Sequence, residues 1–161
     1  MTTLWMIEDL EPWPDEPKVG QVCEPTTYWV TPEMMDLPAE LVCTIPARVE
    51  AIETGDRVER MAHLHDVFTT MLPAGLDATG DTMLTGCLMW DRYLWTDFRT
   101  QPAGRVLVTE RVPLIQRSTR STVEQPGWYT SSYEGPRIMH RASTIPEGHD
   151  VVAYALSVRL L

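Results

Sequence analysis

The 161-residue sequence contains one lysine, Lys18, beside twelve arginines. Mechanisms that need a lysine are excluded unless Lys18 supplies it, and the Gly-Lys-Ser/Thr sequence of a phosphate-binding loop does not occur. Cysteine is also scarce, since the only three are Cys23, Cys43 and Cys87. An odd number without short spacing argues against a disulfide framework and against a zinc site built from cysteines alone. We therefore expect the three cysteines to be buried and to pack like small apolar residues, in a protein of a reducing compartment.

Long hydrophobic runs are missing as well. Residues 1–10 have neither the basic start nor the apolar stretch of a signal peptide. The purest apolar run near the other end, residues 151–156, is far too short to span a bilayer. We therefore expect a cytoplasmic protein that does not contact membranes.

Basic residues are outnumbered by acidic ones, 13 to 23, and the formal net charge is −10. This balance argues against broad binding of nucleic acid and against an anionic membrane surface, because both need clustered cations. The excess lies in residues 1–81, which carry −12, whereas residues 82–161 carry +2. Such asymmetry predicts an acidic face for a partner protein with a basic surface. A solvated surface that keeps the protein soluble fits the same pattern.

Thirteen prolines interrupt the chain, and their spacing argues against a largely helical fold. The length fits a single domain over residues 1–161, and we expect a mainly β fold, α+β at most. Strand and turn signals predict an antiparallel barrel or sandwich of roughly eight strands. Residues 8–17 hold five acids and three prolines, which predicts an acidic, proline-rich flexible segment.

One helix is expected near residues 57–72, because apolar residues recur there at helical spacing and Asp56 with Glu59 resembles a capping box. The spaced residues are Val58, Met61, Ala62, His65, Phe68 and Leu72. Residues 83–99 are rich in Trp, Tyr, Leu and Thr, which favour strands. The sequence does not decide between strand and helix for this segment.

The most metal-like stretch contains His63, His65 and Asp66, whose side chains are of the types that bind metals. On a helix, however, residues two apart point about 200° away from each other. Joint ligation is therefore not expected, and no cofactor is predicted. Recognised catalytic motifs, such as Gly-x-Ser-x-Gly, Cys-x-x-Cys and His-Glu-x-x-His, do not occur.

Two glutamates are candidates for proton transfer. Glu110 lies between Val108 and Val112 on the expected apolar face of a strand, and burial there would raise its pKa. Glu53 holds the matching place in a weak internal similarity between residues 48–53 and 105–110. Two alternatives are open: Glu110 pairs with Arg48, Arg105 or Arg141, or a bulge turns it outward.

Tryptophan and tyrosine are abundant, with six and five residues. Such side chains line small-molecule pockets and protein hot spots, although core packing explains them equally well. The candidate binding residues are Trp13, Trp29, Trp90, Tyr93, Trp95 and Trp128.

Three functions remain in competition. The leading one is a non-enzymatic, acidic partner-binding or inhibitor-type protein, with Trp5, Trp13 and Trp29 as anchors. The second is a β-barrel that binds an apolar small molecule, or a cyclase- or isomerase-like enzyme that uses Glu110 in an aromatic-lined pocket. The third is an assembly component with an oligomer interface. Sequence patterns do not identify the oligomeric state.

Overall fold

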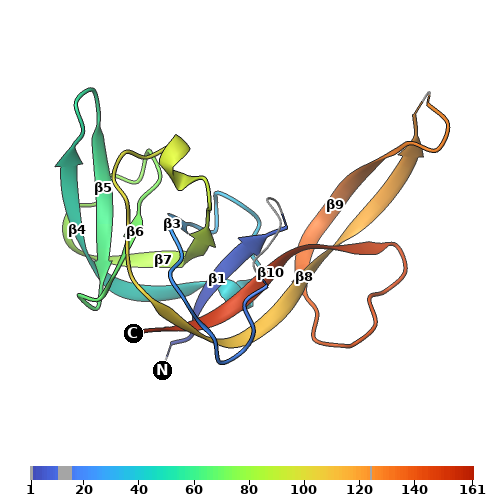
Figure 1. Ribbon diagram of the computed structural model, residues 1–161, viewed down its shortest axis with the longest axis horizontal. Coiled ribbons are helices and arrows are strands. Elements are labelled where there is room, and N and C mark those ends of the chain that lie inside the picture. Colours follow the sequence, from blue (N-terminus) through green and yellow to red (C-terminus); the bar gives the residue numbers. More distant parts are fainter. Residues whose placement is uncertain (1, 11–15, 124) are drawn as a thin grey trace.

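The computed structural model describes residues 2–10, 16–123 and 125–161 and is mainly β (Figure 1). Its ten strands are β1 (Leu4–Asp9), β2 (Val22–Cys23), β3 (Thr27–Val30), β4 (Cys43–Glu53), β5 (Val58–Leu64), β6 (Phe68–Met71), β7 (Gly80–Trp90), β8 (Val106–Thr122), β9 (Tyr129–Met139) and β10 (His149–Leu160). Two short 3-10 helices, η1 (Ala39–Leu41) and η2 (Leu94–Thr96), are the longest helices within these ranges. The predicted mainly β class, with a barrel, is confirmed.

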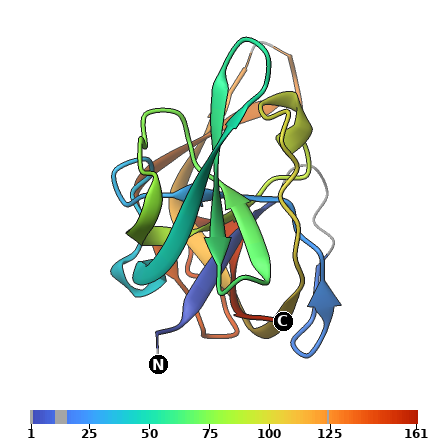
Figure 2. The same ribbon diagram turned by 90° about the vertical axis from the view of Figure 1, so that its left-hand side faces the viewer.

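Five strands close into a barrel in the order β7, β3, β6, β5, β4 and back to β7 (Figure 2). The β4–β7 pairing closes the ring, from Cys43 opposite Gly86 to Val49 opposite Gly80. Within the ring β3 and β6 run parallel and the other neighbours antiparallel. The barrel is therefore mixed rather than purely antiparallel.

The remaining strands extend the sheet outside the barrel. β1 pairs with β7 in parallel, and β10 and β8 follow in antiparallel pairings. β2 and β9 pair with β8. Beyond the sheet, β8 and β9 continue as a two-stranded ribbon that projects at one end of the long axis (Figure 1). We call this ribbon, residues 117–123 and 125–134, the arm.

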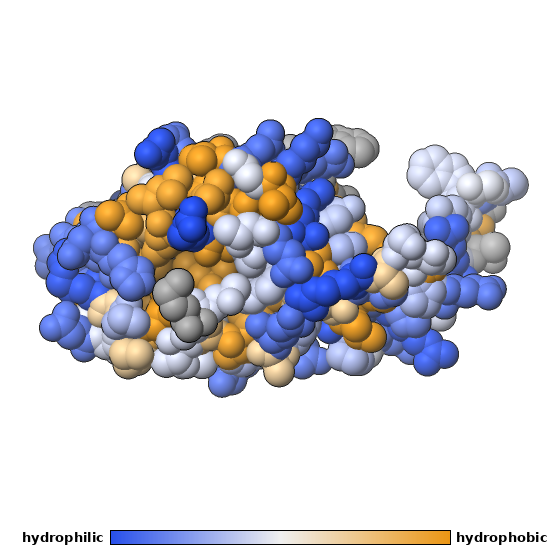
Figure 3. Space-filling model, turned by 90° about the horizontal axis from the view of Figure 1, so that it is seen from below, coloured by the Kyte–Doolittle hydropathy of each residue, from blue (hydrophilic) through white to orange (hydrophobic). Residues whose placement is uncertain are grey.

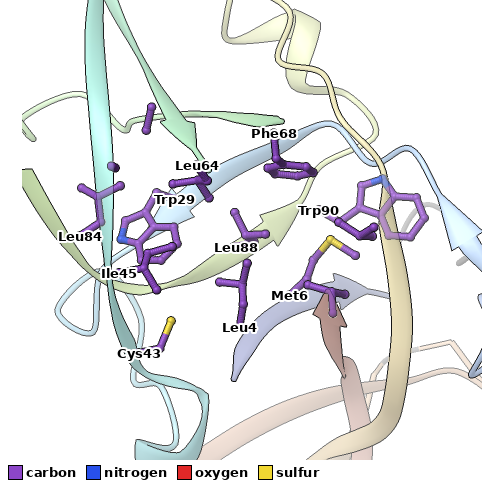
Figure 4. Packing of buried hydrophobic residues seen from close by; sticks show 14 of the residues in the cluster. Leu4, Met6, Trp29, Cys43, Ile45, Leu64, Phe68, Leu84, Leu88 and Trp90 are labelled. Carbon is purple, nitrogen blue, oxygen red and sulfur yellow. The ribbon is translucent and has the colours of Figure 1, made fainter. Parts of the chain in front are cut away.

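Buried side chains form two clusters on opposite faces of the sheet. The inner cluster fills the barrel and includes Trp29, Leu64, Phe68, Leu84 and Leu88 (Figure 4). The outer cluster includes Trp5, Ile7, Leu41, Val112 and Leu114. Each fully buried side chain of this size stabilises the fold by about 1.5–3 kcal/mol. The interior of the barrel is therefore filled by packed side chains.

The helix expected near residues 57–72 is wrong, because β5 and β6 occupy this region as two antiparallel strands. His65 and Asp66 lie between them with φ of 52° and 58°, and the Val67 amide donates to the Leu64 carbonyl. Histidine and aspartate are among the residues that adopt this left-handed conformation most readily. A turn therefore divides the segment, and its helical spacing of apolar residues is coincidental.

Two further regions are now placed. Residues 83–99 continue as strand β7 to Trp90, and η2 follows in a loop. Within the segment 8–17, Glu8 and Asp9 are the end of β1, and residues 11–15 lie outside the described residues. Flexibility of that segment stays a prediction.

Candidate functional site

The arm has two chemically different faces. Side chains that lie opposite each other in an antiparallel pair share a face, and Ser118 pairs with Tyr133 while Arg120 pairs with Ser131. Tyr129, four residues from Tyr133, lies on the same face as both pairs. The Arg120 guanidinium stacks 4.7 Å from the centre of the Tyr129 ring. We call this side of the arm the tyrosine face.

Hydroxyl groups dominate the other side of the arm, which we call the hydroxyl face. Thr119 and Ser132 are a cross-strand pair whose hydroxyl oxygens are 2.7 Å apart, and Ser121 opposes Thr130 on the same side. Arg117 opposes Glu134 there, so the two charges balance. Among the described side chains of the arm, Arg120 is the charged residue of the tyrosine face.

The aromatic side chains of the arm are exposed. Tyr129 and Tyr133 are 54% and 48% exposed, and Trp128 at the tip is 66% exposed. Seen from below, hydrophobic side chains gather on the barrel half, whereas the arm is pale to blue (Figure 3). Its surface is thus aromatic and hydroxylated, which is the composition of adaptable protein-binding surfaces.

The base of the arm is held by polar contacts. Gln116 Nε2 donates to the Gly135 carbonyl at 2.8 Å, where the β8–β9 register shifts. In the chain that follows β9, Arg141 donates to Glu40 at 2.6 and 3.1 Å and to Glu110 at 3.2 and 3.4 Å. Hydrogen bonds from Arg141 lower the pKa of Glu40. The arm is therefore anchored at its base.

The prediction that Glu110 faces inward is wrong. Glu110 opposes Ser157 while Val108 opposes Val158, which leaves Thr109 as the extra residue of a bulge. Val108 consequently belongs to the inner cluster and Val112 to the outer one. The Glu110 side chain is 44% exposed and pairs with Arg141.

The second proposed carboxylate, Glu53, is exposed at the end of β4, where it opposes Val58. Glu110 lines a surface pocket whose other lining residues do not include Glu53. The structure therefore does not bring the two carboxylates together as a proton-transfer pair.

A pocket of about 360 Å³ lies on the flank of the barrel, and we call it the flank pocket. Its residues are Tyr28, Arg57, Val58, Glu59, Arg60, Leu72, Pro73, Ala74, Leu76, Asp91, Asp97 and Phe98. Burial, followed by the nearby charges of Asp9, Asp91 and Asp97, raises the pKa of the Tyr28 phenol. The pocket combines apolar walls with a negative potential.

Glu59 fixes the loop that forms one wall of this pocket. Its carboxylate is almost fully buried and accepts hydrogen bonds from the backbone amides of Arg99 and Thr100 at 2.8–3.1 Å. Arg57 forms an ion pair with it at 2.9 Å. Burial alone would raise the pKa of Glu59, but these donors outweigh it and lower the pKa.

Glu8 is a buried charge that sequence reasoning missed. Its side chain is 0% exposed, and Arg92 and Arg111 approach it at 2.5 and 3.5 Å. The two guanidiniums also stack on Trp90 and Tyr154, at 4.1 and 3.7 Å from the ring centres. Two features of the sequence hid Glu8. It lies in the acidic, proline-rich segment, and residues 4–9 show no alternation of polar and apolar residues.

The possible metal ligands do not form a metal site. His63 Nε2 is 2.9 Å from Glu50, and His65 with Asp66 forms the turn after β5. Within the described ranges, no group of three or more His, Cys, Asp or Glu side chains is arranged to hold a metal ion.

The proposed aromatic anchors separate into buried and exposed side chains. Trp29 and Trp90 are buried at 0% and 8% exposure, so their rings belong to the inner cluster. Trp5 is buried in the outer cluster. Tyr93 and Trp95 are exposed at 51% and 66%; Tyr93 directly precedes η2, and Trp95 lies within it. Trp13 lies outside the described residues.

The cysteines behave as core residues. Cys43 and Cys87 are buried, and Cys23 is partly exposed. Burial, with a smaller effect of Cys43, raises the pKa of the Cys87 thiol to about 12. A thiol with such a pKa stays protonated at neutral pH and is a poor nucleophile.

Comparison of the chain with protein-family models, curated proteins and solved structures gave no match in any of the three. Within the described part of the chain, no helix combines the length and the apolar character that crossing a membrane requires.

Proposed function

We propose that this chain is a cytoplasmic, non-enzymatic protein-binding or assembly component, and that the arm is its binding element. The observation that carries the proposal is the tyrosine face, where Tyr129, Tyr133 and Arg120 share one side of a ribbon with which no further strand of the described residues pairs. Tyrosine and arginine are enriched at binding hot spots. An isolated two-stranded ribbon is only marginally stable in water, so a docked partner would stabilise it.

The charge distribution supports a partner with a basic surface for the rest of the molecule. Residues 1–81 carry −12, and most of the barrel strands belong to this part. Long-range attraction of this kind acts mainly on the association rate. The charged body would thus increase the rate at which the partner associates, and the arm would make the contacts that hold the partner in the complex.

The flank pocket supports a second candidate function, the binding of an apolar small molecule. Leu72, Leu76 and Phe98 offer apolar walls, and the volume lies within the usual range of about 300–1,000 Å³ for ligand sites. The enzyme version of this candidate has less support, because its best residue, Glu110, is half-exposed and paired with Arg141.

The test is a double substitution, Tyr129→Ser with Tyr133→Ser, compared with the matched control Thr130→Ala with Ser132→Ala on the hydroxyl face. Both pairs are exposed, so both variants should keep the unfolding midpoint of the wild type. We expect the wild type and the control to retain the same partner from an extract of the native cells, and the tyrosine-face variant to lose it. Equal retention by all three proteins would contradict the proposal.

A further inference from the structure

We propose that the flank pocket binds a small organic cation, in which an ammonium group is attached to an apolar or aromatic body. The proposal rests on the second candidate function, whose ligand it specifies, and it does not depend on the arm. Two features of the pocket define this ligand class. Its walls are apolar and aromatic, and its lining residues include two carboxylates that no cation of the described residues pairs with.

The walls of the pocket set the body of the ligand. Leu72 and Leu76 come from the end of β6 and the loop after it, Tyr28 comes from β3, and Phe98 comes from the loop after β7. A cavity of about 150 Å³ lined by apolar side chains is large enough for benzene. The flank pocket, at about 360 Å³, therefore has room for one aromatic ring with a short aminoalkyl chain.

The two carboxylates belong to Asp91 and Asp97, which lie on either side of η2 and both line the pocket. Asp91 Oδ1 accepts a hydrogen bond from the Tyr93 amide at 2.8 Å, which leaves its other oxygen for a ligand. Within the described ranges, neither carboxylate forms an ion pair. An ammonium group in the pocket would supply the counter-charge.

The arginines that line the pocket do not supply it, because both are paired elsewhere. Arg57 lies 2.9 Å from Glu59 and donates to the Asp97 backbone carbonyl at 2.5 Å. Arg60 lies 3.3 Å from Asp77. The residues outside the described ranges include no lysine or arginine, so none of their side chains adds a cation. The two aspartates beside η2 are therefore the charges in excess.

Tyr28 responds to this excess of negative charge. Burial raises the pKa of its phenol, and the charges of Asp9, Asp91 and Asp97 raise it further. Aromatic rings attract an ammonium group that approaches their face within about 6 Å. Tyr28 and Phe98 provide two such rings among the lining residues, so the pocket combines both kinds of attraction for an organic cation.

The loop that carries the aspartates is fixed in the absence of a ligand. At its start, the Asp91 amide donates to the Thr26 carbonyl at 3.0 Å, and the Thr26 hydroxyl donates to the Asp91 carbonyl at 2.7 Å. At its end, the amides of Arg99 and Thr100 donate to the buried carboxylate of Glu59. A site that is already ordered loses less conformational entropy on binding.

The test measures the dissociation constants of four probes from the shifts of backbone amide NMR signals of the full chain. The probes are 2-phenylethylammonium, the neutral 2-phenylethanol, the anionic 3-phenylpropionate and the capped lysine N-acetyllysine amide. We expect the ammonium probe to bind about tenfold more tightly than the alcohol, and the propionate to bind most weakly. The shifts should concentrate in residues 57–60, 72–76 and 91–98, and added salt should reduce the preference for the cation.

Asp91→Asn with Asp97→Asn removes both carboxylates but keeps an acceptor for the Tyr93 amide. We expect this variant to bind the ammonium probe no more tightly than the alcohol, with its affinity for the alcohol unchanged. The matched control is Asp36→Asn with Asp81→Asn, which removes the same two charges from exposed positions that do not line the pocket. The control should keep the full preference, and the amide spectra show whether each variant is folded.

A second pair of variants tests the location. Ala74→Arg fills the pocket with a long cationic side chain, so we expect it to abolish binding of every probe. Thr79→Arg places the same side chain at an exposed position outside the pocket and should bind like the wild type. Unchanged binding by Ala74→Arg would overturn the inference.

The other outcomes separate this inference from the candidate function on which it rests. Equal affinity for the ammonium probe and the alcohol would overturn the inference and leave an apolar ligand as the candidate. Absence of binding by every probe would overturn both. Tighter binding of the capped lysine than of 2-phenylethylammonium would also overturn the inference, because it would assign the pocket to a side chain of a partner protein.

Discussion

Among the described charged side chains, the buried carboxylate of Glu8 is one whose loss should strongly affect stability. Replacing it by glutamine keeps the shape but removes the buried negative charge that Arg92 and Arg111 share. Breaking a buried ion pair costs about 3–5 kcal/mol, so we expect Glu8→Gln to lower the free energy of unfolding by that amount.

Urea unfolding at pH 7 measures this loss, and Glu110→Gln is the matched control. Glu110 is also paired with an arginine, but both side chains are close to half-exposed. Exposed pairs contribute about 0–1 kcal/mol. Equal losses in the two variants would show that Glu8 does not carry the buried charge described above.

Glu59 gives the protein a pH-dependent increment of stability. Because its pKa is lowered in the folded state, the increment is complete above the pKa of about 4.3 that an unfolded chain has. It is lost as the pH falls through the lowered folded pKa. Glu59→Gln should therefore be less stable than the wild type at pH 7, by about 1.5–3 kcal/mol for hydrogen bonds to a charged group.

The gap between the two proteins should close in acid. Unfolding curves recorded from pH 7 down to pH 3 measure it, with Glu53→Gln as an exposed control that should match the wild type throughout. A constant gap at every pH would mean that the Glu59 carboxylate does not have a lowered pKa.

At the scale of the elements, β7 depends on Gly86, where its pairing changes from β4 to β3. Gly86 has φ of 142°, and a Cβ atom there would lie 1.9 Å from the Val30 carbonyl oxygen. Gly86→Ala should therefore combine backbone strain with a steric clash and cost about 3 kcal/mol or more.

Gly75→Ala is the comparison, because Gly75 also has positive φ, 93°, but nothing within 4 Å of the added atom. It should cost only the strain, about 1–2 kcal/mol. Thermal unfolding of both variants checks the difference, and an equal loss would contradict the close packing of β7 against β3.

Turn chemistry explains which elements the sequence could predict. Alternation in β4, with Cys43, Ile45, Ala47 and Val49 buried, is a period-two signal that residue patterns reveal. The β5–β6 turn was missed because His65 and Asp66 carry no glycine or proline, and the apolar residues around them also fit a helix. A bulge that turns Glu110 outward is one of the alternatives that the sequence leaves open, and the register of β8 against β10 places this bulge at Thr109.

At the scale of the whole molecule, composition and proline distribution predicted the mainly β class, because that class depends on local preferences that repeat along the chain, but they left a barrel and a sandwich open. The arm and the flank pocket could not be predicted in this way. They depend on which strands pair beyond the sheet and on which loops meet at the barrel surface, and these are contacts between residues far apart in the sequence.

The proposed function requires the tyrosine face of the arm to be a binding surface. The most direct measurement places a photo-crosslinking amino acid at Ser131 or at Ser132, which are adjacent in β9 but lie on opposite faces of the arm. In the native cells, we expect Ser131 on the tyrosine face to give a discrete crosslinked product and Ser132 on the hydroxyl face to give little or none. Equal crosslinking at both positions, or crosslinking at Ser132 alone, would contradict the account.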